Sequence, residues 1–279
     1  MVTVSTMARS SSSRDISFDT DFGVARIRWD GPRATLFLGE VESSAVDTSD
    51  PTYLEFEYMQ HMDAVVSSLW GPQDRFRALH VGGAACALAC AWSSSHPQSR
   101  HVAVEVDRLL AEQVRVHFPI PKAPQVKIRV GDGRAVLDGA REGSFDVIVR
   151  DAFASGVTPD HLRTVECADR ARRALAASGV YLVNCAHGGP ANARQDVAAL
   201  QEVFPFVASI QDPKVGRGGR RGNVVALASA TDVVNVDQID RALRMLALPA
   251  RITRPADLAR WVAGTPALTD SQVGYPQAD

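Results

Sequence analysis

The feature that most constrains the fold of this chain is a regular alternation of short apolar segments with amphipathic ones between residues 77 and 203. The apolar segments RALHV, HVAVEV, VKIRV, FDVIVR and GVYLVN have the length and composition of strands. Segments with helical spacing lie between or after them, over about 107–117, 159–176 and 191–203. Apolar strands that alternate with helices form parallel sheets covered on both faces. The sequence therefore predicts a doubly wound α/β domain.

The last two strands of this domain follow a different pattern. The segments FVASIQ and NVVALAS are joined by the Gly/Arg-rich loop DPKVGRGGRRG, which is too short for a crossover helix. We expect these two strands to be antiparallel neighbours. Five alternating β/α units closed by an antiparallel hairpin are typical of class I methyltransferase-like folds, rather than of a plain dinucleotide-binding dehydrogenase fold.

The rest of the chain is expected to add smaller parts at both ends of this domain. Alternating and β-branched residues around Gly31-Pro32 predict a hairpin. Helical spacing predicts helices over 52–69 and 239–248, and the Pro-containing end from Gly264 is expected to be loose. The predicted organisation is a disordered arm over 1–15, an N-terminal β-hairpin unit over 16–51, a Rossmann-like methyltransferase-fold domain over 52–249 and a C-terminal tail over 250–279.

Composition and charge exclude several classes of partner. The chain has 46% hydrophobic and 22% charged residues, and its formal net charge of −2 creates no field that would gather nucleic acid or acidic lipid. The most apolar window, 78–92, is shorter than the roughly 18 residues needed to span a bilayer. The one basic loop lacks aromatic residues for base stacking; it contains Lys214, Arg217, Arg220 and Arg221. We expect neither a nucleic-acid nor a membrane partner.

The cysteines and histidines bear on the compartment and on metal binding. The four cysteines form no C-x-x-C pair and lie in segments that read as buried, so we expect a reducing, cytoplasmic compartment. The Ser-rich N-terminus lacks the apolar stretch of a secretory signal. The seven histidines show no ligand spacing, and no metal site is predicted. His61 shares a helical face with Tyr58, where it either lines a pocket or packs in the core.

Ligands of open parallel sheets bind beyond the carboxyl ends of the strands, so residues there are the candidate site residues. Gly82-Gly83 follows RALHV, where a tight turn lets the backbone approach a ligand, although a plain strand-to-helix turn also favours glycine. Glu105 ends HVAVEV about 20 residues later, where a carboxylate can accept hydrogen bonds from ribose hydroxyls. The alternative role for Glu105 is a charge at the start of the next helix, which Asp107 can supply.

The third strand end is the G-D-G sequence after VKIRV. Asp132, between two glycines, can lie against a flat base and accept a hydrogen bond from its exocyclic amine, although G-D-G is also a common turn. Turn chemistry alone does not need a carboxylate at each strand end. The Gly-Gly pair, Glu105 and Asp132 together therefore predict a site for an adenosine-type nucleoside.

The fourth strand end places Asp151 after FDVIVR, where it is expected to point into the same crevice. A nucleoside site needs no further acid. A carboxylate suits an amine co-substrate, because it attracts an ammonium and can take its proton as a general base. The alternatives for Asp151 are a helix N-cap or an ion pair with Arg150.

In their order and spacing, these motifs resemble the spermidine synthase (polyamine aminopropyltransferase) family, from the N-terminal hairpin to the strand ending near Ser229. The matching segments are FEY at residues 56–58, the Gly-rich turn, VEVD, GDG, DVIVRD and VFPF. The resemblance implies that Glu105 holds the ribose of decarboxylated S-adenosylmethionine, that Asp132 holds its adenine and that Tyr58 contacts the amine. It also implies that Asp151 activates the attacking nitrogen and that the N-terminal unit helps to form a homodimer.

Three positions depart from the family's pattern. The family's G-G-G-D-G turn reads GGAAC, which puts Ala85 where an acid would grip the aminopropyl ammonium. The family's D-S-S-D reads DAFA, so the acid for the far end of a diamine is lost at Ala154. Val215 takes the place of a substrate-binding Tyr. Each charge-assisted hydrogen bond contributes roughly 1.5–3 kcal/mol, so we expect weakened diamine recognition.

The sequence thus predicts a transferase that moves an aminopropyl group from decarboxylated S-adenosylmethionine to an amine and releases 5′-methylthioadenosine. No metal or tightly bound cofactor is expected, because this displacement needs only alignment of the reactants and deprotonation of the amine. Two alternatives stay open. One is an S-adenosylmethionine-dependent methyltransferase with the same nucleoside residues, and the other is a non-catalytic nucleoside-binding relative, which Ala85, Ala154 and Val215 would suit.

Overall fold

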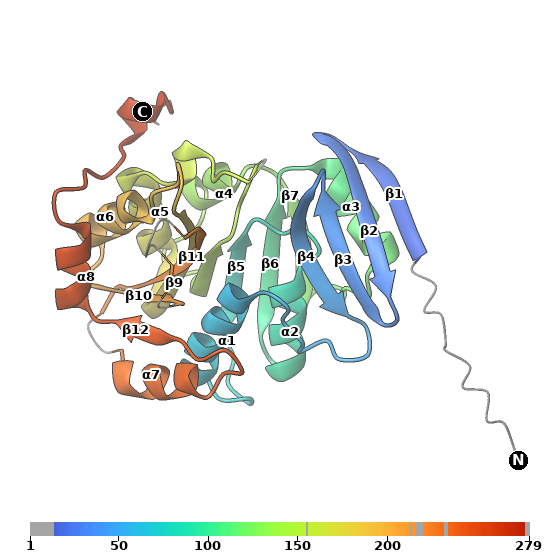
Figure 1. Ribbon diagram of the computed structural model, residues 1–279, viewed down its shortest axis with the longest axis horizontal. Coiled ribbons are helices and arrows are strands. Elements are labelled where there is room, and N and C mark those ends of the chain that lie inside the picture. The colour runs from blue at the N-terminus through green and yellow to red at the C-terminus, as the bar shows by residue number, and fades with distance from the viewer. Residues whose placement is uncertain (1–13, 155, 213, 216–219, 232–233, 277–279) are drawn as a thin grey trace, which may run out of the picture.

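The computed structural model describes residues 14–154, 156–212, 214–215, 220–231 and 234–276 (Figure 1). Its main sheet has eight strands in the order β12-β10-β11-β9-β8-β5-β6-β7. The strands are β5 (Arg77–Val81), β6 (Arg100–Glu105), β7 (Val126–Val130), β8 (Phe145–Arg150), β9 (Leu175–His187), β10 (Phe206–Gln211), β11 (Gly222–Ser229) and β12 (Arg251–Thr253).

The pairing of these strands confirms the predicted fold class. Strands β5 to β9 pair in parallel, whereas β11 lies antiparallel between β9 and β10. The apolar segments expected as strands and the closing hairpin are therefore placed as in a class I methyltransferase-like fold. Strand β12, which pairs antiparallel with β10, has no counterpart in the sequence prediction.

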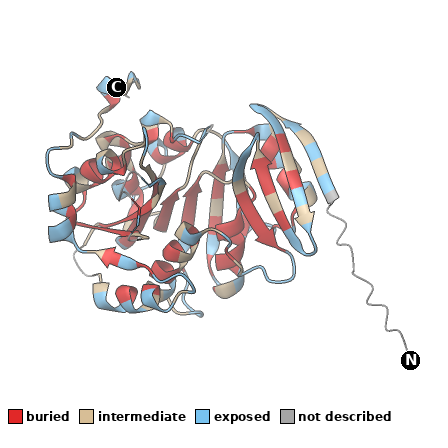
Figure 2. Ribbon diagram, viewed as in Figure 1, coloured by how far each residue is buried: buried red, intermediate tan, exposed pale blue. Residues whose placement is uncertain are grey.

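Helices cover both faces of the main sheet, and each face has its own buried core (Figures 1 and 2). One face carries α1 (Glu57–Leu69), α2 (Ala87–Ser95), α3 (Arg108–His117) and α7 (Val236–Arg244). The other carries α4 (Gly133–Asp138), the short 3-10 helix η1 (Asp160–Leu162), α5 (Val165–Ala174), α6 (Ala193–Val203) and α8 (Pro255–Val262).

Three of the expected helices differ clearly from the observed ones in their bounds. The helix expected over 52–69 begins only at Glu57. The helix expected over 159–176 is divided into η1 and α5, because the Thr164 hydroxyl accepts a hydrogen bond from the Cys167 N–H and so caps α5. The helix expected over 239–248 runs from Val236 to Arg244, and the Asn235 side chain caps its start.

The N-terminal part forms an antiparallel sheet of four strands rather than a single hairpin. The expected hairpin forms its centre, and β1 and β4 extend it on either side; the strands are β1 (Arg14–Thr20), β2 (Gly23–Asp30), β3 (Arg33–Leu38) and β4 (Val41–Asp47). Ile27 and Leu36 are fully buried in the core shared with α1 and α2. The arm predicted for 1–15 lies outside the described residues except for Arg14 and Asp15, which begin β1.

The expectation that the chain from Gly264 is loose is wrong. Asp270 begins the short helix α9 (Asp270–Val273), and its buried carboxylate accepts two hydrogen bonds from Arg134, at 2.8 and 2.6 Å. The Thr269 hydroxyl and the Gln272 side chain form a capping box at the start of α9. These long-range polar contacts hold in place a segment whose local composition predicted no ordered structure.

The described residues contain no helix long and apolar enough to cross a membrane. The predicted basic loop is only partly described, because Arg217 lies outside the described residues. In the described part, Arg220 lies 3.7 Å from the Asp212 carboxylate, which offsets some of the loop's positive charge.

Candidate active site

The residues predicted at the four strand ends meet at the carboxyl edge of the main sheet. The Ala84 N–H, in the turn after β5, donates to the Glu105 carboxylate at 2.9 Å. The Gly131 N–H donates to the main-chain oxygen of Glu105 at 2.9 Å, and the Asp151 N–H donates to the main-chain oxygen of Val81 at 2.8 Å. The central strand β5 thus lies between Asp151 on one side and the Glu105 and Asp132 turns on the other.

The fold requires glycine at one of the two positions after β5 but not at the other. Gly82 has a positive φ of 96°, and a Cβ there would lie 2.1 Å from the Asp151 main-chain oxygen. The fold itself therefore requires glycine at position 82. A Cβ at Gly83 would make only ordinary contacts, the nearest at 3.5 Å from the Val104 oxygen. Packing of the described chain does not explain the glycine at position 83. The absence of a side chain there would let a ligand approach the main chain.

The rest of this turn is strained where the family's pattern has glycine. Ala84 and Cys86 have positive φ angles of 37° and 57°, a conformation that costs a non-glycine residue roughly 1–2 kcal/mol. Ala85, between them, is fully buried. An acid at position 85 would therefore need a cationic partner and a wider pocket.

Glu105 is bonded to main-chain N–H groups through both carboxylate oxygens. One oxygen accepts from Ala84 and the other from Asp107, at 2.9 and 3.1 Å. Burial raises the pKa of Glu105, and the main-chain hydrogen bonds partly offset that shift. Asp107 itself caps α3 by accepting from the Leu110 N–H, so Glu105 is not needed as the helix cap. Each oxygen of Glu105 keeps a lone pair for a ligand hydroxyl.

Asp132 is partly used by the fold. One of its oxygens caps α4 by accepting from the Ala135 N–H at 2.9 Å, which confirms that the G-D-G sequence is also a turn. The other oxygen lies 3.0 Å from Nε2 of His161, a residue that the sequence analysis did not single out. The hydrogen bond from His161 is the largest cause of the lowered pKa of Asp132.

Asp151 is held by two side chains. The Tyr58 hydroxyl donates to one carboxylate oxygen at 2.9 Å, and the Asn184 amide donates to the other at 2.8 Å. Burial raises the pKa of Asp151, while the Asn184 and Tyr58 hydrogen bonds lower it. Burial also raises the pKa of Tyr58 well above its ordinary value, so the phenol stays protonated and donates.

The structural alternatives for Asp151 find no support among the described contacts. Arg150 points away and pairs with Asp196 at 2.7 Å. No helix begins at Asp151, because η1 starts only at Asp160. The acid is therefore held in place without pairing with a cation or capping a helix.

Asn184 was missed by the sequence analysis, although a signal for it exists. It is the one polar residue that ends the apolar strand segment GVYLVN, and the same strand-end reasoning that selected Asp151 would have selected it. Its Oδ1 atom is buried without a hydrogen-bond partner among the described residues, and the same is true of Nδ1 of His61. Buried polar atoms without partners are uncommon and call for an explanation.

The remaining positions of the predicted amine half do not form a second acidic subsite. Ala154 is exposed, and Val215 is buried against Gly222. His61 is buried, and this burial lowers its pKa to about 4. Among the described residues, no group of three His, Cys, Asp or Glu side chains could hold a metal ion.

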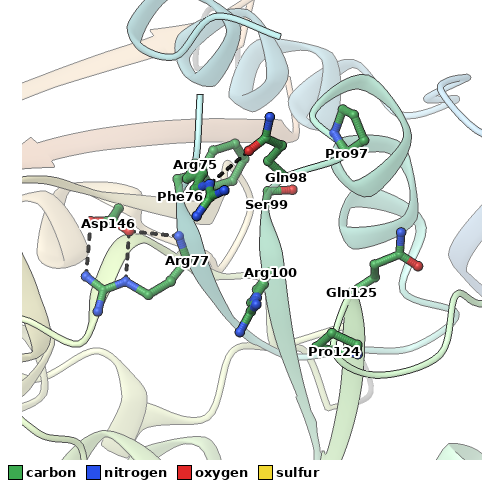
Figure 3. A pocket seen from close by; sticks show the side chains of 10 residues that line it. All are labelled: Arg75, Phe76, Arg77, Pro97, Gln98, Ser99, Arg100, Pro124, Gln125 and Asp146. Carbon is green, nitrogen blue, oxygen red and sulfur yellow. Dashed lines mark hydrogen bonds and ion pairs between the residues drawn. The ribbon is translucent and has the colours of Figure 1, made fainter. Parts of the chain in front are cut away.

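A cavity of about 520 Å³ lies at the opposite edge of the main sheet, where β5 and β6 begin (Figure 3). Two of its three arginines already have partners: Arg75 donates to Gln98 at 2.8 Å, and Arg77 pairs with Asp146 at 3.1 Å. Ligands of open parallel sheets bind at the carboxyl edge, so this cavity is not the candidate active site.

Comparison with known proteins decides the family. No family model matches the chain. A crystal structure of a probable spermidine synthase from Corynebacterium glutamicum ATCC 13032 is 33% identical, with a TM-score of 0.84, over 91% of this chain and 95% of that one. The chain belongs to the spermidine synthase family. The family predicted from the motif order is thereby confirmed.

Two further relatives are more distant in sequence. The chain is 24% identical over 173 residues to the polyamine aminopropyltransferase of Vibrio vulnificus (strain CMCP6), which is 61% of this chain and 56% of that relative. The chain thus spans about half the length of the curated relative. A spermidine synthase in complex with the transition state analogue AdoDATO shares the fold at 16% identity, with a TM-score of 0.59 over 93% of this chain and 87% of that one.

Proposed function

We propose that this chain transfers an aminopropyl group from decarboxylated S-adenosylmethionine to an amine and releases 5′-methylthioadenosine. The observation that carries the proposal is Asp151, held by Tyr58 and Asn184 beside the turn that Glu105 binds. The named activities of the relatives, polyamine aminopropyltransferase and spermidine synthase, support it.

The donor is bound, in this proposal, by the nucleoside residues. Glu105 accepts hydrogen bonds from the ribose hydroxyls, and Asp132 accepts one from the adenine amine. The donor can approach the main chain at Gly83, where the packing of the fold does not itself require glycine. Decarboxylated S-adenosylmethionine acts as a co-substrate, and we expect no metal or tightly bound cofactor, because the sulfonium is already a good leaving group.

The acceptor amine is bound at Asp151. An ammonium carries three N–H donors, and the Asp151 carboxylate and the unpartnered Oδ1 of Asn184 can both accept from it. An alkylammonium with a pKa near 10.4 has no free lone pair at neutral pH. Asp151 takes one proton, and its raised pKa makes it a better base than an exposed aspartate.

The transfer step is a displacement at carbon. The lone pair of the deprotonated amine forms a bond to the aminopropyl carbon next to the sulfonium. The carbon–sulfur bond breaks, and its electron pair stays on sulfur, which becomes the neutral thioether of 5′-methylthioadenosine. Alignment of the two reactants supplies most of the acceleration, and Asp151 supplies the deprotonation.

The positions that departed from the family's pattern bear on which amine is the acceptor. Of the positions to which the resemblance assigns amine recognition, Ala85 and Val215 are buried and Ala154 is exposed, and Asp151 is the acid that remains. We propose that the acceptor is an amine whose recognition does not depend on a second, distal ammonium.

The test is a product assay combined with binding. Titration calorimetry with 5′-methylthioadenosine, S-adenosylmethionine and the decarboxylated donor would be followed by an assay of methylthioadenosine release against a panel of monoamines and diamines. The proposal requires preference for the decarboxylated donor and release with at least one amine. Preference for S-adenosylmethionine would favour a methyltransferase, and binding without turnover would favour the non-catalytic reading.

We also propose a homodimer in the cytoplasm. The N-terminal sheet exposes apolar side chains, with Phe22 at 75% and Val24 at 56% exposure, which suits a contact with a second copy. The four cysteines are free and buried, as a reducing compartment allows. Sedimentation of the wild type and of Phe22→Ser would test the dimer. The division of the chain into domains at residues 51 and 249 stays a prediction.

A further inference from the structure

We propose that the segment 269–276 is part of the nucleoside site, where Tyr275 and His161 hold Asp132 in the orientation that selects adenine over hypoxanthine. This inference rests on the proposed function, in which Asp132 accepts a hydrogen bond from the adenine amine. It assigns a role to two side chains and to a C-terminal segment that the strand-end motifs do not include.

His161 contacts Asp132 directly. Nε2 of His161 lies 3.0 Å from Oδ2 of Asp132. The lowered pKa of Asp132 keeps its carboxylate ionised, so it can only accept and Nε2 must carry the proton. With the Ala135 N–H bound to the other oxygen, both oxygens of Asp132 are oriented by donors.

Tyr275 supports His161. The two rings are stacked at 5.4 Å between centroids and are nearly parallel, with an angle of 6°. The Arg134 guanidinium lies 4.5 Å from the centre of the same Tyr275 ring. The tyrosine is therefore in contact with the histidine that orients Asp132 and with a cation two residues beyond Asp132.

Polar contacts anchor the C-terminal segment. Arg134 binds the Asp270 carboxylate through two nitrogens, with side-chain exposures of 4% and 3%. The Thr164 hydroxyl donates to the same carboxylate at 2.7 Å, and Glu166 accepts from the Asp270 N–H at 2.9 Å. A buried and fully bonded pair of this kind fixes geometry, so the position of Tyr275 is set by the helix that Asp132 begins.

Asp132 can bind a base in this arrangement. Its side chain is 39% exposed, and each carboxylate oxygen has a second lone pair beyond the one already used. An adenine amine donates to that lone pair, whereas the hypoxanthine carbonyl presents an acceptor and is repelled. A site that accepts a hydrogen bond from its ligand strongly rejects an analogue that lacks the hydrogen-bond donor. This requires that the accepting side chain is held in place.

The test compares two nucleosides in matched variants. Affinities for 5′-methylthioadenosine and 5′-methylthioinosine would be measured by calorimetry, and their ratio is the selectivity. His161→Leu removes the donor and should lower the ratio about tenfold, whereas His161→Gln keeps an amide donor and should restore most of it. Tyr275→Ala should lower the ratio about threefold, and Tyr275→Phe, which keeps the stack, should rescue it.

Melting temperatures show which variants are folded, so that a loss of selectivity can be assigned to the orientation of Asp132 rather than to unfolding. Asp132→Asn serves as the reference that loses the selectivity altogether. If Asp132→Asn loses it while folded His161→Leu and Tyr275→Ala keep the wild-type ratio, the inference is overturned and the proposed function survives. If the wild type does not bind methylthioadenosine, both fail. A His161→Leu protein too unstable to assay is replaced by His161→Ala, which also lacks the donor and for which the same loss of selectivity is expected.

Discussion

The two halves of the candidate active site are bonded to the protein in different ways. In the donor half, Glu105 and Asp132 accept hydrogen bonds from main-chain N–H groups of the turns around them. In the acceptor half, the donors to the Asp151 carboxylate in the described part of the chain are the side chains of Tyr58 and Asn184. Main-chain donors thus hold both acids of the donor half, with His161 as an added side-chain donor to Asp132, whereas side-chain donors hold the acid of the acceptor half.

This difference has a consequence for how the site can change. A substitution at Glu105 disturbs both the ligand and the turn that begins α2, so stability opposes it. Side chains that recognise the amine can be exchanged without altering the main chain, and the departures at Ala85, Ala154 and Val215 all fall at positions to which the family resemblance assigns amine recognition. We infer that acceptor specificity can diverge in such a fold while the nucleoside site persists.

The largest effect is expected in the acceptor half. Asp151→Asn preserves shape and removes the base, so turnover with the preferred amine should fall by about 10²–10⁴-fold. Binding of methylthioadenosine should stay within about twofold, because the donor half is intact. Steady-state kinetics and calorimetry on the same preparation check both values, and turnover equal to that of the wild type would refute the general-base role.

The same variant also makes a prediction about stability. The pKa of Asp151 is raised in the folded chain, so the folded state binds more protons than the unfolded one in the pH window between 3.8 and the raised pKa. Asp151 therefore costs stability as the pH rises through that window, and the cost persists at neutral pH. Asp151→Asn should melt no lower than the wild type at pH 7, and lower melting would contradict the assigned direction of the shift.

In the donor half, Glu105→Gln should weaken methylthioadenosine binding by roughly 1–3 kcal/mol, because the ribose hydroxyls lose a charged acceptor. Burial raises the pKa of both Glu105 and Asp151. Glu105→Gln should nevertheless lower the melting temperature, unlike Asp151→Asn, because its new NH2 group would face a main-chain N–H of Ala84 or Asp107 that cannot rotate away. Asp132→Ala should weaken the nucleoside likewise. Unchanged affinity in Glu105→Gln would exclude this residue from the site.

A gain of function tests the depleted acceptor half. Ala154→Asp supplies a counter-charge for a distal ammonium, and because position 154 is exposed, turnover of putrescine should rise only about twofold to fivefold. Ala85→Asp is the matched contrast, since position 85 is fully buried and an acid there should destabilise the fold. Unchanged putrescine kinetics in a folded Ala154→Asp protein would count against the missing subsite.

A shift in the pH profile would sharpen the assignment of the base. The Asn184 and Tyr58 hydrogen bonds both lower the pKa of Asp151, with Asn184 the larger cause. Tyr58→Phe should therefore move the acidic limb of kcat/KM to higher pH, and Asn184→Ala should move it further. A limb that stays in place in both variants would mean that another group controls the profile.

The smallest effect concerns the strained turn between the halves. Ala84→Gly relieves a positive φ and costs some entropy in the unfolded chain, so the free energy of unfolding should rise by about 0.5 kcal/mol. Denaturant titration measures it. Destabilisation by this substitution would show that the turn is not strained at Ala84.

The sequence was sufficient where the signal is local. Strand periodicity placed Glu105, Asp132 and Asp151 at strand ends, and parallel pairing then brought them to one edge without further information. His161 and Tyr275 were missed because their contacts depend on partners far away in sequence, such as Asp132 for His161. Asn184 was missed although it ends an apolar strand segment, where the same local reasoning applies. Neither the hydrogen bond between His161 and Asp132 nor the ion pair of Arg134 with Asp270 leaves a periodic pattern in the sequence.

Gly82 has one more implication. Its missing side chain lets the main chain at Asp151 cross directly over the β5 turn, at a separation that even a methyl group would prevent. In the proposed function, the two reactants lie on either side of this contact, so the distance between the ends of β5 and β8 helps to set how far the attacking nitrogen must reach. Redesign of the acceptor pocket can then alter which amine enters without altering the reach of the attack, and an enzyme engineer could treat specificity and reaction geometry as separate variables.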